Sequence, residues 1–120
     1  MAEPMKVAHV FPGQGSQWVG MGRDLYENFD SAKEVFKQAD QVLGFPLSEL
    51  CFEGPEDELR QTINVQPAIV TVSFACLEVA LVAAGGNGLP PPNFVAGHSL
   101  GEYTALVAAR VLDFATTVYL

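Results

Sequence analysis

The chain has 120 residues, of which 49% are hydrophobic and 17% are charged. This length and composition predict one compact unit with an apolar core, and they exclude a disordered chain. Six Lys and Arg residues against fourteen Asp and Glu residues give a net charge of -8, so we expect no nucleic acid partner, because a negative surface repels phosphates.

The first predicted element is a strand over residues 6–11, where β-branched and aromatic residues precede Pro12. This apolar run predicts a strand that is covered on both faces. Residues 13–17 (Gly-Gln-Gly-Ser-Gln) follow as a loop. We expect a helix over residues 18–28, although two glycines weaken its start.

The next predicted helix spans residues 30–43, with Asp30 as its N-cap and Gly44 at its end. The spacing of its apolar residues predicts an inward face. That face consists of Ala32, Val35, Phe36, Ala39 and Leu43. Residues 45–51 are interpreted as a connector, and a short acidic helix is predicted from Gly54-Pro55 to Gln61.

Residues 65–84 form the longest apolar segment, which Asn64 is suited to cap. Its length raises the possibility of a membrane span, but Glu78 would cost roughly 2.5 to 3.5 kcal/mol near a bilayer centre. We therefore predict a buried helix in a cytoplasmic protein with no membrane partner. Cys51 and Cys76 lack zinc-ligand spacing, so we predict no metal site and expect two buried free thiols in a reducing compartment.

Glycines at 85–88 and prolines at 90–92 separate this helix from a second predicted buried strand over residues 93–97. A helix over residues 101–110 and a last helix, which Asp113 caps, complete the pattern. Strands separated by helices predict parallel pairing and an α/β fold. Two strands leave edges and helix faces uncovered, so we expect this chain to be the first part of a larger domain.

The strongest chemical signal is Gly97-His98-Ser99-Leu100-Gly101, which matches Gly-x-Ser-x-Gly between a strand and a helix. This context is typical of a nucleophile elbow, in which Ser99 occupies a strained corner and the Leu100 N–H faces a developing oxyanion. Ligands of parallel sheets bind beyond the carboxyl ends of the strands, where the 13–17 loop also lies. Gln14 is therefore a second candidate amide donor, and its two flanking glycines allow close backbone approach. A simple turn is the alternative for this loop.

A serine nucleophile needs a base, which is usually a histidine. The histidines of the chain are His9 and His98. His98 adjoins Ser99, and neighbouring side chains diverge at a sharp turn, so we expect His98 to pack beneath the elbow. We interpret His9 as a core residue, and Glu102 as a structural or solvated carboxylate. None of these residues is therefore assigned as the base. On sequence pattern alone, Gln66 is a polar residue in the first turn of its helix.

Taken together, residues 11–17, 65–68 and 97–103 resemble the malonyl-CoA:acyl carrier protein transacylases of fatty acid synthesis, and the resemblance runs from about Lys6 to Leu120. It implies part of an α/β-hydrolase-like parallel sheet with flanking helices. Residues 1–120 would be the N-terminal part of the large acyltransferase subdomain, and the family's ferredoxin-like subdomain is absent from this chain.

The resemblance also implies a ping-pong reaction in which malonyl-CoA acylates Ser99 and the pantetheine thiol of acyl carrier protein then takes the malonyl group. The CoA thioester is a substrate, and no cofactor is implied. Gln14 and the Leu100 amide would form the oxyanion hole. The implied substrate-binding residues are Gln66, Gly13, Gly15 and His98.

The sequence departs from the family because it ends before the catalytic histidine and before the arginine that holds the malonyl carboxylate. Arg110 lies too early to replace that arginine. We therefore expect the chain alone to have little activity, and we expect basic docking residues to lie outside it. An acyltransferase domain of a polyketide synthase, a serine thioesterase or other hydrolase, and a noncatalytic piece are the alternatives.

Overall fold

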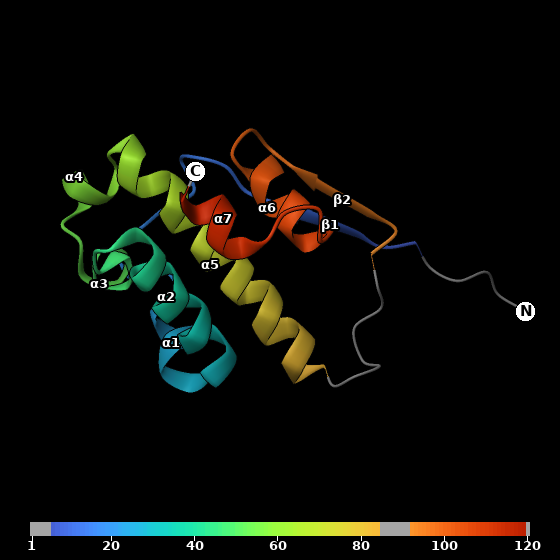
Figure 1. Cartoon of the computed structure of the whole chain (residues 1–120), viewed down its shortest axis with the longest axis horizontal. Helices are drawn as coiled ribbons and strands as arrows, with labels where there is room; N and C mark the ends of the chain where they lie inside the picture. The colour runs from blue at the N-terminus through green and yellow to red at the C-terminus, as the bar shows by residue number, and fades with distance from the viewer. Residues whose placement is uncertain (1–5, 85–91, 120) are drawn as a thin grey trace, which may run out of the picture.

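The computed structural model describes residues 6–84 and 92–119 of the chain. Within these ranges, helices pack to one side of a pair of parallel strands (Figure 1), which confirms the α/β class. The elements in chain order are β1 (Ala8–Phe11), α1 (Arg23–Asn28), α2 (Asp30–Leu43), α3 (Leu47–Glu53), α4 (Glu56–Leu59), α5 (Thr62–Ala83), β2 (Phe94–Gly97), α6 (Gly101–Ala108) and α7 (Phe114–Tyr119). The glycine stop predicted at 85–88 and most of the proline link lie outside the described residues.

The sheet has one covered face. β1 and β2 pair in parallel with Phe11 opposite Gly97, and α6 packs against both strands. Phe11 is buried on the side of α6, whereas Val10 and Phe94 are 73% and 63% exposed on the other side. The prediction that both faces of the strands are covered is therefore wrong within the described residues. The helices of these residues cover only one side of the sheet.

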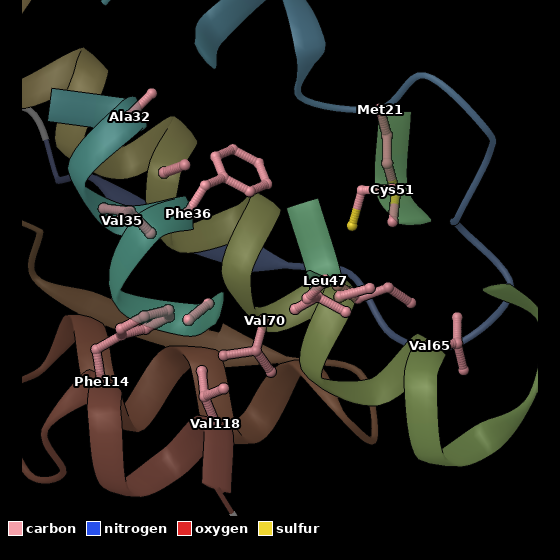
Figure 2. Packing of buried hydrophobic residues seen from close by; sticks show 14 of the residues in the cluster. Met21, Ala32, Val35, Phe36, Leu47, Cys51, Val65, Val70, Phe114 and Val118 are labelled. Atoms are coloured by element: carbon pink, nitrogen blue, oxygen red, sulfur yellow. The ribbon is translucent and has the colours of Figure 1, made fainter. Parts of the chain in front are cut away.

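The main core lies among the helices. Phe36 is fully buried where α2 packs on α5, and Phe114 and Val118 of α7 close the same cluster (Figure 2). Phe36 also contacts the rings of Tyr26 and Phe52, with centroids 5.9 and 5.0 Å away. This packing gives the helical layer a closed interior that does not depend on the open face of the sheet.

The helix α2 ends at Gly44 as predicted, with a φ of 77°, but it begins one residue earlier than predicted. Its N-cap is Phe29 rather than Asp30. The helix α1 starts later than predicted because Gly20 and Gly22 have φ angles of 103° and 80°, which are incompatible with a right-handed helix.

Residues 45–51 are not a simple connector, because most of them belong to α3. Leu47 and Cys51 are four residues apart and both fully buried, so they form the inward face of a short amphipathic helix. Burial raises the pKa of the Cys51 thiol to about 12, with a smaller contribution from the Asp40 carboxylate. The thiol is therefore protonated at neutral pH.

The helix α5 is the central core helix. By length and composition it could cross a membrane, with a mean hydropathy of 1.9, yet it packs against α2, α6 and α7. Gln61 is its N-cap, while Asn64 instead donates a hydrogen bond to the Glu58 carbonyl. Cys76 is a free thiol but is exposed, so the prediction that it is buried is wrong. Its neighbour Ala75 takes the buried position on this helix.

Asp113 caps α7 as predicted. Its carboxylate accepts hydrogen bonds from the Thr116 N–H at 2.8 Å and the Thr116 hydroxyl at 2.9 Å. These bonds favour the charged form and hold the pKa of Asp113 below its usual range.

The backbone just after α6 adopts an unfavourable conformation. Arg110 has a φ of 63°, and it stands where helices commonly place glycine. The Val111 N–H donates to the Leu106 carbonyl at 2.9 Å, and the Arg110 N–H donates to the Val107 carbonyl at 3.0 Å. This pair of bonds is a Schellman motif with an arginine in its left-handed position.

We predict that Arg110→Gly raises the free energy of unfolding by about 1 kcal/mol, because glycine adopts a positive φ without a Cβ clash. Urea denaturation followed by circular dichroism measures the change. The control is Arg110→Ala, which removes the guanidinium but keeps the Cβ atom and should give no such gain. Equal stabilisation by both variants would show that the charge, and not the backbone, is the cause.

Candidate active site

Ser99 occupies the sharp corner between β2, which ends at Gly97, and α6, which begins at Gly101. Its φ is 53° and its side chain is exposed. A left-handed conformation is costly for a residue with a Cβ atom, and it persists only where the surroundings impose it. The strained strand-to-helix corner predicted from the sequence is present, and it directs Ser99 outward as an elbow requires.

Two glycines allow this corner to form. A Cβ atom on Gly97 would collide with the backbone of Gly101, and a Cβ atom on Gly101 would collide with the Phe11 and Pro12 carbonyl groups. The start of α6 therefore lies directly against the backbone of both strands. No side chain larger than hydrogen fits at either position without moving the helix away from the sheet.

The N–H of Leu100 is available at this corner. The three N–H groups that follow it donate to the three carbonyls that start at His98, each at 3.0 Å. The Leu100 N–H donates to no acceptor within residues 6–84 and 92–119. A backbone donor next to the serine at the start of a helix is suited to an oxygen that gains negative charge.

The 13–17 loop lies beside the serine corner. Gly13 is buried, and a Cβ atom there would collide with the His98 carbonyl oxygen. The loop is folded by a 2.8 Å bond from the Ser16 hydroxyl to the Gly13 carbonyl and by a bond of the same length from the Gly15 N–H to the Gln17 side chain. Gln14 is exposed between these bonds. The parallel register thus brings both motifs to the same end of the sheet.

Neither histidine is positioned as a base. His98 is exposed, and a Cβ atom on Gly13 would lie 3.3 Å from its Nδ1, so the expectation that it packs beneath the elbow is wrong. The ring lies toward the loop because the close approach of Gly101 to the strands leaves no room underneath. His9 is half-buried on the covered face of the sheet, in line with its interpretation as a packing residue. Ser99 forms no side-chain hydrogen bond with either ring in the part of the chain that the structure describes.

A cavity of about 430 Å³ brings Gln66 of α5 and Leu100 together. Ser99 and Gln14 do not line it. Tyr103, one helical turn after Ser99, also lines the cavity, a position that was not predicted from the sequence. Its spacing of four from the serine was the available signal. The lining consists of Leu43, Phe45, Ile63, Gln66, Pro67, Val70, Leu100, Tyr103, Thr117, Val118 and Tyr119.

We predict that Gly101→Ala lowers the free energy of unfolding by more than about 3 kcal/mol, because the added methyl group meets immobile backbone. Gly44→Ala is the matched control. Unlike Gly101, Gly44 has a positive φ, at 77°, but nothing lies within 4 Å of the added Cβ, so Gly44→Ala should cost about 1 kcal/mol. Urea denaturation of both variants measures the difference, and equal losses would contradict the steric account of the corner.

Similarity to known proteins extends over almost the whole of this chain. A model of the acyl transferase domain family matches residues 8–118. The malonyl CoA-acyl carrier protein transacylase of Bacillus subtilis is 52% identical over 114 residues, which are 95% of this chain and 34% of that protein. The solved malonyl CoA-acyl carrier protein transacylase of Coxiella burnetii superposes with a TM-score of 0.87 at 43% identity, covering 96% of this chain and 35% of that one.

A further solved relative comes from a complex of a type II polyketide acyl carrier protein with its malonyl-transacylase. Its TM-score is 0.84 at 43% identity, over 95% of this chain and 36% of that one. The chain thus spans about a third of the length of the relatives it matches.

Proposed function

This chain belongs to the acyl transferase domain family, and from that premise we propose that it forms the N-terminal part of the large subdomain of a malonyl-CoA:acyl carrier protein transacylase. The observation that carries the proposal is the strained Ser99 corner, at which the Leu100 N–H has no acceptor among the described residues. The open sheet face at Val10 and Phe94 supports the placement within a larger domain, because parallel strands are normally covered on both faces.

In the proposed reaction the Ser99 Oγ attacks the thioester carbonyl carbon of malonyl-CoA. The carbonyl oxygen becomes an oxyanion, which accepts hydrogen bonds from the Leu100 N–H and the Gln14 side-chain amide. The C–S bond then breaks, the CoA thiolate leaves and the malonyl group stays on Ser99. The pantetheine thiol of acyl carrier protein reverses these steps, and Ser99 recovers its proton.

We propose that two groups lie outside these 120 residues. One is the base that takes the serine proton, and the other is the group that holds the malonyl carboxylate. His9 and His98 are both directed elsewhere, and Arg110 lies at the opposite end of α6 from Ser99. A net charge of -8 also repels two acidic partners. The basic docking surface for malonyl-CoA and acyl carrier protein is therefore assigned to the remainder of a longer protein.

We predict that the longer protein that carries this chain becomes malonylated on Ser99 when it is mixed with malonyl-CoA. Intact-mass spectrometry measures one added malonyl group, which is absent in Ser99→Ala and present in the control Ser31→Ala, whose serine lies on α2. Addition of acyl carrier protein should discharge the adduct to the carrier thiol.

Other outcomes identify the alternatives. Release of free malonate without carrier would indicate a thioesterase or other hydrolase, and preferential labelling by branched malonyl thioesters would indicate a polyketide synthase domain. A wild-type protein that never forms the adduct would support a noncatalytic role. The 120-residue chain alone should turn over far more slowly than the longer protein, and comparable rates would contradict the assignment of the base outside it.

A further inference from the structure

The backbone of His98 is held by hydrogen bonds on both sides, although the residue is exposed. Its N–H donates to the Phe11 carbonyl at 3.2 Å, and its carbonyl accepts the Gly101 N–H at 3.0 Å. The first bond ties the residue to the end of β1, and the second ties it to the start of α6. The root of the imidazole side chain therefore has a fixed position, and only the side-chain torsions remain to be set.

The imidazole of His98 lies against Gly13, the first residue of the 13–17 loop. The three heavy atoms nearest to a Cβ atom on Gly13 would all belong to His98: the carbonyl oxygen, Nδ1 at 3.3 Å and the carbonyl carbon at 3.4 Å. Gly13 is buried, whereas Gln14 and Gly15 after it are exposed. Because residue 13 has no side chain, the loop backbone approaches both the carbonyl group and the ring of His98.

Gln14 depends on this anchor for its direction. The Gly13 carbonyl accepts the Ser16 N–H at 3.3 Å and the Ser16 hydroxyl at 2.8 Å, so the loop turns tightly after its first residue. The side chain of Gln14 forms no hydrogen bond with any other residue in the ranges 6–84 and 92–119. Its amide is therefore directed by the backbone on which it stands, and that backbone starts at Gly13.

Oxyanion stabilisation is sensitive to such an anchor. A donor that is already in place does not have to be oriented while charge develops on the substrate oxygen. A displacement of about 1 Å in a reacting geometry costs up to roughly a hundredfold in rate. His98 directly precedes Ser99 and Leu100, so this one residue is linked to the nucleophile, to one donor and to the loop of the other donor.

We propose that His98 is a positioning residue, whose imidazole holds the 13–17 loop against the serine corner and thereby places the Gln14 amide relative to Ser99. This proposal rests on the proposed function, in which Gln14 donates to the oxyanion. It gives His98 a role that requires no contact with the substrate.

The test is a double-mutant cycle in the longer protein that carries this chain, with the single-turnover rate of Ser99 malonylation by malonyl-CoA as the readout. Gln14→Ala should lower this rate about a hundredfold, as the loss of one oxyanion donor does. His98→Ala should lower it about tenfold at an unchanged half-saturating concentration of malonyl-CoA, because the donor acts in the transition state. In the Gln14→Ala protein, His98→Ala should have no further effect.

His98→Asn separates positioning from a general loss of structure. Its amide places a nitrogen or oxygen atom close to the site of the imidazole Nδ1, so this variant should retain most of the wild-type rate. A loss as large as that of His98→Ala would overturn the proposal, and so would an equal effect of His98→Ala with and without the Gln14 side chain. Wild-type protein that forms no malonyl adduct on Ser99 would instead overturn the proposed function, and the positioning role with it.

Discussion

The direct contact between the start of α6 and the backbone of the two strands is the constraint on which the candidate site depends. Gly97 and Gly101 have no side chains, so the helix begins against the Phe11 and Pro12 carbonyl groups. The chain must then turn within residues 98–100, and this short turn forces a positive φ on Ser99. The exposure of the serine follows from this one approach of helix to sheet, and so does the position of the Leu100 N–H, which has no acceptor in the part of the chain that the structure describes.

The helical core supports that arrangement from the other side. The packing of α2, α5 and α7 holds α5 in place, with Phe36 and Val70 buried in the same cluster. Because α5 also contacts α6, the Gln66 and Pro67 end of α5 and the Leu100 end of α6 form two walls of one cavity. The cavity and the serine corner thus share one framework, although Gln66 and Leu100 are more than thirty positions apart in the sequence.

The parts of the fold that could be predicted are those with strong local signals. The repeat of buried residues from Ala32 to Ala39, followed by Gly44, was sufficient to predict the helix α2 and its end, with its start displaced by one residue. The Asp113 cap was equally local. Where a segment is stabilised mainly by contacts with residues distant in sequence, local patterns were insufficient to predict its structure. Residues 47–53 form the helix α3 because Leu47 and Cys51 reach the core, and Cys76 is exposed because Ala75 points inward in its place.

For the site, the sequence by itself determined the chemical groups and their order: a serine between two glycines, a strand before it, a helix after it, and a Gly-Gln-Gly loop after the first strand. Only the tertiary structure decided which of these groups meet. Parallel register places Gly13 against His98, packing exposes the His98 ring, and the cavity joins Gln66 to Leu100 and Tyr103. Spacing along a chain specifies local backbone conformation, whereas the distance between remote residues depends on how helices and strands pack together.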